Sequence, residues 1–339
     1  MQKFASAARE SFLRDSSKQV FDLIEPELDL VEKEFDRQAS SNIQVIDYLG
    51  EYLRDSGGKR VRPALLILAN YAVGGTATND NVIRLATVME MLHTATLVHD
   101  DIIDNAELRR SRASVSARFG NQTAVLMGDW LYMSAFETTV QERSLEIIDI
   151  LTRLTRKMTE GELIQLTRLG RLDISESEYF DILSRKTAYL FSACCEVGAI
   201  IGGADTEQRS AMRDYGLALG VAFQLSDDIL DLTGATESLG KAAGSDLLEG
   251  KLTLPLIYLL DRMPEMKAAI ERVMVEGDYT AVSRPQLLQM LAERGILDEV
   301  RQRANDHAES ARKSLDVLPR SEYRSCLDNV LSFVVDRNL

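Results

Sequence analysis

The chain has 339 residues, of which 45% are hydrophobic, so it is long enough to bury a large core. Its 6 prolines and 20 glycines are few for this length, which argues against a β-sandwich or a linker-rich array. With 39 basic and 53 acidic residues the net charge is −14, which argues against a nucleic-acid partner.

Cysteine usage and hydropathy predict a cytoplasmic protein. Cys194, Cys195 and Cys326 have no metal-type spacing, and adjacent cysteines rarely pair, so we expect buried, reduced thiols. The first residues, MQKFASAARESFLRD, lack the apolar core of a signal peptide. The longest charge-free run, residues 63–79, contains polar residues and two glycines, so we expect no transmembrane segment.

Helical periodicity dominates the chain. Residues 83–104, IRLATVMEMLHTATLVHDDIID, carry apolar residues three and four apart, and TNDN before them offers capping side chains. Residues 174–203 begin with a capping box of Ser175 and Glu178 and end at a glycine pair. Each stretch predicts a helix.

The rest of the chain continues this pattern. A further helix is predicted to start at Asp205-Thr206 and to end at Gly234. After about residue 252, amphipathic stretches alternate with breakers at Pro264, Pro285 and Pro319. No segment alternates with a period of two, and no linker or repeat divides the chain. We therefore predict an all-α fold, a single domain over residues 1–339 with roughly ten or more helices.

Three aspartates, Asp100, Asp101 and Asp104, lie at the end of the first predicted helix. On a helix, residues four apart share one face about 6 Å apart, so Asp100 and Asp104 can share ions while Asp101 flanks them. Carboxylates at this spacing suit Mg²⁺, which takes its remaining ligands from water and phosphate. Taken alone, the pattern is also common on solvated helix faces.

A second acidic cluster, Asp227, Asp228 and Asp231, repeats the same spacing on another apolar helix. Two solvated charge patches would not be expected to copy one spacing within apolar surroundings. We therefore expect two acidic helix faces opposed across a cavity. Together they would hold two or three Mg²⁺ ions, which a diphosphate would bridge.

A basic loop, GGKRVRP at residues 57–63, offers Lys59, Arg60 and Arg62 just before Pro63 opens a helix. It is not a Walker loop, because GxxxxGK[ST] is absent. With Arg109 and Arg110 beyond the first acidic cluster, the cations suffice for a second diphosphate held without metal. His93 lies two turns before Asp100 on nearly the same face, which favours a phosphate hydrogen bond over a core role.

These motifs, with GDWLY, KTA, GKAAGSDLLEGKLTLP and the tail FVVDRNL, resemble the trans-isoprenyl diphosphate synthases of long-chain type. The resemblance implies an isoprenoid-synthase fold, a helical bundle around a deep central cavity, usually as a homodimer. It also implies the reaction, a Mg²⁺-dependent head-to-tail condensation of isopentenyl diphosphate with an allylic diphosphate such as farnesyl diphosphate.

The resemblance also implies a role for each matching residue. The Mg²⁺ ligands would be Asp100, Asp104 and Asp227, supported by Asp101, Asp228 and Asp231. The isopentenyl diphosphate site would comprise Lys59, Arg62, His93 and Arg110. The allylic diphosphate site would comprise Arg109, Lys186, Thr187, Gln224 and Lys241, with Lys186 and Gln224 also taking part in catalysis.

Product length is expected to depend on the helix that precedes Asp100, because one helical turn of 5.4 Å is close to one isoprene unit. Short-chain relatives carry a bulky aromatic residue four or five positions before the first aspartate. Here these positions are Thr96 and Ala95, both small, with Met91 one turn lower. We therefore predict a C30–C50 product, such as octaprenyl diphosphate for quinone side chains. Its release would involve transient contact with a membrane surface.

Three alternatives remain. A geranylgeranyl diphosphate synthase would perform the same chemistry and stop at C20. A class I terpene cyclase shares the first aspartate motif but usually carries an Asn/Ser/Glu second metal site, whereas DDILD is intact here. A non-catalytic partner subunit would be expected to have lost an aspartate cluster or the basic loop, and both are complete.

Overall fold

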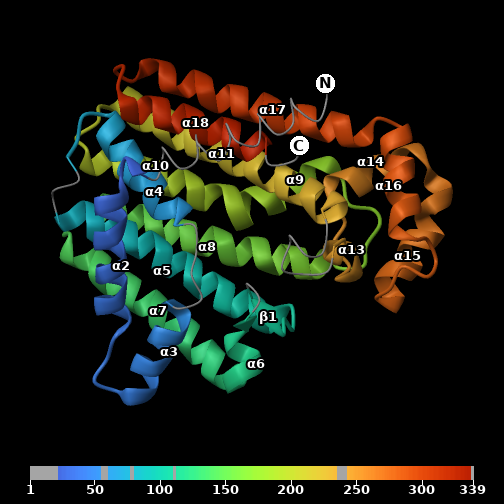
Figure 1. Ribbon diagram of the computed structural model, residues 1–339, viewed down its shortest axis with the longest axis horizontal. Coiled ribbons are helices and arrows are strands. Elements are labelled where there is room, and N and C mark those ends of the chain that lie inside the picture. The colour runs from blue at the N-terminus through green and yellow to red at the C-terminus, as the bar shows by residue number, and fades with distance from the viewer. Residues whose placement is uncertain (1–21, 55–59, 77–79, 110–111, 235–242, 337–339) are drawn as a thin grey trace. The chain divides into compact units, whose positions relative to one another are not determined.

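The computed structural model describes residues 22–54, 60–76, 80–109, 112–234 and 243–336, and α-helices make up almost all of its regular structure (Figure 1). The predicted all-α fold is confirmed, with more than ten α-helices among these residues. One short antiparallel ladder, β1 (Leu108–Arg109) with β2 (Arg112–Ala113), was not predicted, since two-residue strands leave no period-two pattern to detect.

The helices that carry or neighbour the predicted site residues are α2 (Glu25–Ala39), α4 (Val61–Ala72), α5 (Asp80–Ile103), α7 (Asn121–Gln141), α8 (Leu145–Arg168), α9 (Glu176–Leu183), α10 (Tyr189–Ile201) and α11 (Thr206–Thr233). The others are α3 (Gln44–Arg54), α6 (Val115–Phe119), α13 (Ser245–Leu248), α14 (Leu254–Arg262), α15 (Lys267–Glu276), α16 (Arg284–Glu293), α17 (Ile296–Ser314) and α18 (Glu322–Asp336).

The chain forms two compact units. Unit 1 comprises Met1–Thr155, Leu190–Gly216 and Arg312–Phe333, and unit 2 comprises Arg156–Tyr189, Leu217–Ala311 and Val334–Leu339. The prediction of one domain over the whole chain stays a prediction.

Unit 1 is built around α5, against which α2, α4 and α7 pack. Most of α5 from Val82 to Leu92 is buried, as expected for a helix with neighbours on several sides. The α4 helix starts at Val61, two residues before the predicted start at Pro63, so Arg62 lies in its first turn. It also meets α10 closely, because a Cβ added at Gly198 would overlap the carbonyl oxygen of Leu66. Glycine is therefore required at this contact.

Unit 2 has an apolar core formed by α9, the second half of α11 and α13 to α17. The predicted capping box is confirmed, with the Ser175 hydroxyl accepting from the Glu178 backbone amide. The predicted helix over 174–203 is interrupted, because Ser184–Ala188 form the π-helix η1 between α9 and α10. The α11 helix runs from Thr206 to Thr233, as predicted.

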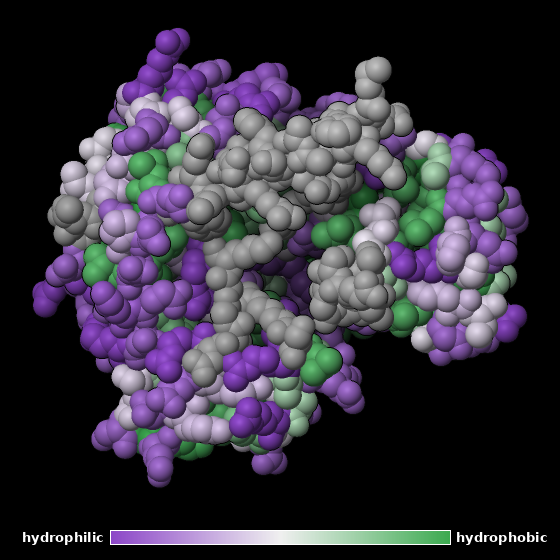
Figure 2. Space-filling model, viewed as in Figure 1, coloured by the Kyte–Doolittle hydropathy of each residue, from purple (hydrophilic) through white to green (hydrophobic). Residues whose placement is uncertain are grey.

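The thiols are buried, as predicted. Cys194, Cys195 and Cys326 are free, and burial raises the pKa of Cys194 to about 12. Hydrophilic side chains cover much of the face seen in Figure 2. Within the described ranges, none of the helices has both the length and the apolar character that a membrane span needs.

Candidate active site

The first acidic cluster closes α5 in unit 1. Asp101 is buried, and its Oδ1 accepts from Arg109 Nε at 2.8 Å and from Nη2 at 2.5 Å. Asp100 is half-buried and Asp104 is exposed. The three aspartates are therefore not equivalent, since an arginine engages the middle one while the outer two reach solvent. Arg109, predicted to bind the allylic diphosphate, here positions a carboxylate.

A pocket in unit 1 brings several of the predicted residues together. It is lined by Arg60, Glu90, His93, Leu97, Asp101 and Arg109, among others. Arg62 does not line it; it lies in the first turn of α4, with its guanidinium 5.2 Å from the centre of the Phe191 ring. Lys59 and Arg110 lie outside the described residues. The structure thus places His93 in one pocket with Asp101 and Arg109, and the predicted hydrogen bond from His93 to phosphate stays a prediction.

The second acidic cluster lies on α11 in unit 2. Asp228 is buried, with its carboxylate accepting from Tyr179 Oη at 2.5 Å and from Gln224 Nε2 at 2.9 Å. Burial, with the nearby charges of Asp246 and Asp227, raises the pKa of Asp228 to about 8. The second aspartate of this cluster is therefore held from inside the protein, as Asp101 is in unit 1.

Asp231, the last aspartate of the second cluster, holds the start of α13 in place. Its carboxylate accepts from Ser245 Oγ at 3.1 Å and from the Asp246 amide at 3.3 Å. Its backbone carbonyl accepts from the Gly244 amide at 2.7 Å. Asp231 therefore supports the arrangement of residues around Asp246, whereas half-buried Asp227 is the more accessible carboxylate.

The π-helix η1 presents Lys186 and Thr187 to the same region of unit 2. Thr187 Oγ1 donates to Gln224 Oε1 at 2.8 Å, and Lys186 Nζ lies 2.5 Å from Glu162 Oε2 on α8. A pocket in unit 2 is lined by Lys186, Thr187, Gln224, Asp228, Asp246 and Lys251, with leucine and isoleucine side chains beside them. Four predicted site residues thus meet here, while Lys241 lies outside the described residues.

The carboxylates of the two acidic clusters suit a hard divalent cation. Among the residues that the structure describes, no three Asp, Glu, His or Cys side chains converge on one point. The donors are carboxylate oxygens, the ligand type that Mg²⁺ prefers. In unit 2 the charges of Asp227 and Asp246 disfavour ionised Asp228, and a divalent cation would offset this repulsion.

The predicted chain-length residues lie on α5 away from the pocket in unit 1. Ala95 and Met91 are fully buried, and Thr96 Oγ1 donates to the His93 carbonyl at 2.7 Å. At about 100° per residue, Ala95 points nearly opposite to the face that carries Leu97 and Asp101. Their role in product length stays a prediction.

Three residues of these surroundings escaped sequence reasoning: Glu162, Tyr179 and Glu90. Glu162 pairs with Lys186, Tyr179 donates to Asp228, and Glu90 pairs with Arg60. Tyr179 and Glu90 occupy apolar helical stretches where a core role is the default expectation. Glu162 lies in a segment rich in charged residues, so a search for acidic partners of Lys186 could have found it.

Gly161→Ala should disturb the lysine of η1. The added Cβ would lie 2.6 Å from Arg185 Cβ and 3.2 Å from the Lys186 amide nitrogen, so η1 must move away from α8. We expect a loss of about 1–3 kcal/mol in unfolding free energy, the usual cost of overpacking. Because Lys186 is predicted to bind the allylic diphosphate, the variant should also bind that substrate more weakly. Denaturant unfolding and substrate titration measure both effects, and Leu163→Ala, exposed on the same helix, serves as control.

Comparisons with known proteins find relatives over most of the chain. A family model described as polyprenyl synthetase matches residues 43–290. The chain is 38% identical over 316 residues to the octaprenyl diphosphate synthase of Haemophilus influenzae, covering 93% of this chain and 95% of that protein. It is 36% identical over 291 residues to the geranylgeranyl diphosphate synthase of Methanosarcina mazei, covering 84% of this chain and 88% of that protein.

A solved structure matches the fold as well. The polyprenyl synthase from Caulobacter crescentus CB15, complexed with calcium and isoprenyl diphosphate, has a TM-score of 0.89 and 37% sequence identity. The match covers 95% of this chain and 98% of that one, so it spans both compact units.

Proposed function

Because this chain belongs to the polyprenyl synthetase family, we propose that it is a trans-prenyltransferase that condenses isopentenyl diphosphate head-to-tail with an allylic diphosphate. The observation that carries the proposal is that each of two acidic clusters lies beside its own cation. Asp101 is bound by Arg109 in unit 1, and Asp228 lines one pocket with Lys186 in unit 2. Such pairs of acid and base suit a diphosphate that arrives with divalent cations.

The product is an all-trans polyprenyl diphosphate in the C30–C50 range, such as octaprenyl diphosphate, suited to quinone side chains. Two observations support this length: the 38% identity to an octaprenyl diphosphate synthase, and the small side chains of Ala95 and Thr96. Geranylgeranyl diphosphate is the second candidate product, since the geranylgeranyl diphosphate synthase of Methanosarcina mazei is 36% identical.

Asp100, Asp104 and Asp227 would hold two or three Mg²⁺ ions, with Asp101, Asp228 and Asp231 fixing the helices that carry them. The Caulobacter crescentus polyprenyl synthase is complexed with a divalent cation, calcium, together with isoprenyl diphosphate, which supports a metal requirement in this chain. When bound, Mg²⁺ would neutralise the negative charge that develops on the departing diphosphate.

The other site residues would divide between the two substrates. Lys59, Arg62, His93 and Arg110 would bind isopentenyl diphosphate. Arg109, Lys186, Thr187, Gln224 and Lys241 would bind the allylic diphosphate. Cations fixed in advance stabilise charge as it develops, since they need no reorganisation during the reaction.

The chain's own side chains perform the positioning. Thr187 and Gln224 are joined by a hydrogen bond, and Gln224 also donates to Asp228, so one contact chain links η1 to the second acidic cluster. The apolar side chains beside them, such as Leu183 and Leu252, would keep water from the allylic carbocation. Once the allylic C–O bond has broken and the diphosphate has left, the double bond of isopentenyl diphosphate would attack the carbocation to form the new C–C bond. The resulting cation would lose a proton from its isopentenyl part, and the released diphosphate would accept that proton.

The assembly and location follow from the same proposal. We place the protein in the cytoplasm as a homodimer of single-domain chains, with transient membrane contact when the long product leaves. A long prenyl tail is nearly insoluble in water, which supports delivery at a membrane surface.

The test is to incubate the purified protein with Mg²⁺, farnesyl diphosphate and isopentenyl diphosphate, with an EDTA control, and to size the products by mass spectrometry. A metal-dependent ladder ending at C30 or beyond is expected. A ladder that stops at C20 would confirm prenyl transfer but make geranylgeranyl diphosphate the product. A hydrocarbon without elongation would favour a cyclase, and the absence of any product would favour a partner subunit.

A further inference from the structure

Arg60, in the middle of the basic loop, is turned away from solvent. Its side chain is 12% exposed, and its Nη1 donates to Glu90 Oε1 at 2.8 Å. Its Nε and Nη2 both donate to Glu32, with Nη2 at 2.9 Å from Oε2, and the guanidinium lies 5.7 Å from the centre of the Phe35 ring. One arginine therefore has two carboxylate partners and an aromatic neighbour.

The backbone at Arg60 also requires this support. Arg60 is the N-cap of α4 and has φ 47° and ψ 35°, the left-handed conformation. For a residue with a β-carbon this conformation is unfavourable and persists where the surroundings fix it. Glu90 is 4% exposed, so it would be a buried unpaired charge without Arg60. The conformation of the loop where it enters α4 and this ion pair depend on each other.

The two carboxylates come from two different helices. Glu90 lies on α5, three residues before His93, and lines the same pocket as His93. Glu32 and Phe35 lie on α2, which ends at Ala39 and so precedes the stretch 43–290 that the family model matches. A helix outside that stretch thus contacts the basic loop directly.

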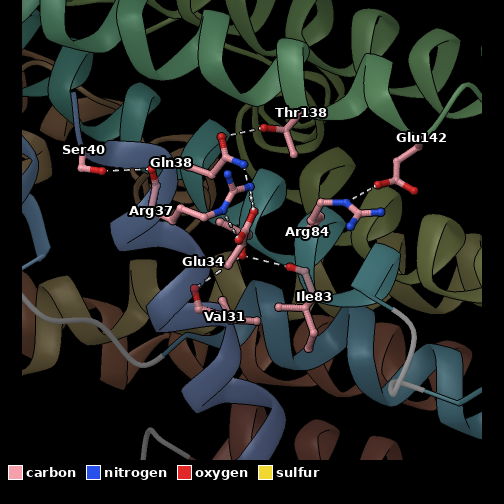
Figure 3. A network of polar contacts seen from close by, with 10 residues as sticks. Val31, Glu34, Arg37, Gln38, Ser40, Ile83, Arg84, Thr138 and Glu142 are labelled. Carbon is pink, nitrogen blue, oxygen red and sulfur yellow. Dashed lines mark hydrogen bonds and ion pairs between the residues drawn. The ribbon is translucent and has the colours of Figure 1, made fainter. Parts of the chain in front are cut away.

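Other contacts hold α2 in place (Figure 3). Gln38 Oε1 accepts from Thr138 on α7 at 2.8 Å. The Thr87 hydroxyl on α5 donates to the Ile83 carbonyl at 2.9 Å and lies 3.4 Å from the carbonyl of Val31. A separate ion pair, Arg84 with Glu142 at 2.6 Å, joins α5 to the residue after α7. Because α2 packs against α5 and is hydrogen-bonded to α7, its neighbours hold the backbone that carries Glu32.

We propose that Arg60 is a positioning residue held by Glu32 and Glu90, and that α2 thereby forms part of the isopentenyl diphosphate site. These three residues, the Arg60 clamp, fix the entry into α4 so that Arg62 keeps its place relative to His93. Arg60 itself does not bind phosphate, since its donors are committed to the two glutamates. This inference rests on the proposed function, in which this pocket receives isopentenyl diphosphate.

Steady-state kinetics of Glu32→Gln, Glu90→Gln and Arg60→Lys test the Arg60 clamp. Each variant should raise the KM for isopentenyl diphosphate roughly 10- to 100-fold, the usual loss when the support of a binding group is removed. The KM for the allylic diphosphate and kcat at saturation should change by no more than a factor of a few. If Arg60 bound the diphosphate itself, both glutamine variants would lower this KM or leave it unchanged, which would overturn the proposal.

Two matched controls separate positioning from general damage. Asp29→Asn removes an exposed carboxylate from α2, and Glu142→Gln breaks the ion pair of Arg84. Neither should change the KM for isopentenyl diphosphate. A change of equal size in either control would show that the effect is not specific to the Arg60 clamp.

A double-mutant cycle of Arg60→Gln with Glu90→Gln completes the test, with thermal unfolding followed in parallel. The double variant should raise the KM no further than either single variant, whereas independent effects would multiply and contradict the clamp. If Glu90→Gln does not fold, the KM values of Glu32→Gln and Arg60→Lys decide the test. Glu32 is 37% exposed, so its substitution should leave the fold intact. An inactive wild-type protein would refute the proposed function, whereas an active one with unchanged variants would refute the Arg60 clamp alone.

Discussion

Asp100→Asn is expected to lower kcat by about 10³-fold, and Asp227→Asn by a similar factor, with little change in fold. Removing one group that stabilises charge in a transition state typically costs about 10²–10³-fold, and an aspartate that holds a cation acts at the upper end. Both residues are half-buried, so asparagine keeps the packing and removes the charge. Single-turnover kinetics with a Mg²⁺ titration measure the loss.

The Mg²⁺ titration also separates ligands from supporting residues. A variant of a metal ligand should need more Mg²⁺ for half-maximal rate. Asp101→Asn should mainly destabilise the fold, because it breaks the ion pair between buried Asp101 and partly exposed Arg109. Asp149→Asn, at an exposed position of α8, should change neither kcat nor the Mg²⁺ concentration for half-maximal rate. Turnover within tenfold of wild type in Asp100→Asn would remove this residue from the metal site.

The helices that carry both acidic clusters could be predicted from the sequence because their signals are local. Apolar residues three and four apart predicted α5 and α11, and the capping box of Ser175 and Glu178 predicted the start of α9. Each signal lies within a few residues of the feature that it predicts. Interactions close in sequence are those that periodicity and capping rules describe.

The internal structure of the clusters could not be predicted in this way. Spacing makes Asp100, Asp101 and Asp104 look alike, yet Arg109 eight residues later engages only Asp101. Asp228 is distinguished by Tyr179, which is 49 residues away in sequence. The partner of a carboxylate is decided by packing between helices, and helical periodicity carries no information on it.

The π-helix η1 and the role of Arg60 show the same limit. The sequence predicted one continuous helix over 174–203, because no glycine or proline marks Ser184–Ala188. The close approach of α8 at Gly161 accompanies the wider turn there. Arg60 looked like a third phosphate-binding cation, whereas Glu32 and Glu90 engage it in the folded chain.

Ala95→Phe is expected to shorten the product from C30–C50 to C20 or less. Ala95 is fully buried on α5, one turn and a residue before Asp100, so a benzyl group there would meet the prenyl tail after few additions. A graded series supports this reasoning: Ala95→Val, →Leu and →Phe should end the ladder at successively shorter products. The KM for isopentenyl diphosphate should stay unchanged, since the first condensation takes place above the blocked depth.

Overpacking alone must be separated from this steric effect. Ala69→Leu adds the same volume as Ala95→Leu at a buried position of α4. Ala69 faces α10, because a Cβ added at Gly198 would lie 3.1 Å from the Ala69 Cβ. Both variants should lose about 1–3 kcal/mol of unfolding free energy. Only Ala95→Leu should shorten the product in mass spectrometry, because only position 95 would line the path of the growing tail. An unchanged ladder in Ala95→Phe would exclude Ala95 as the residue that limits length and transfer that role to another part of the wall.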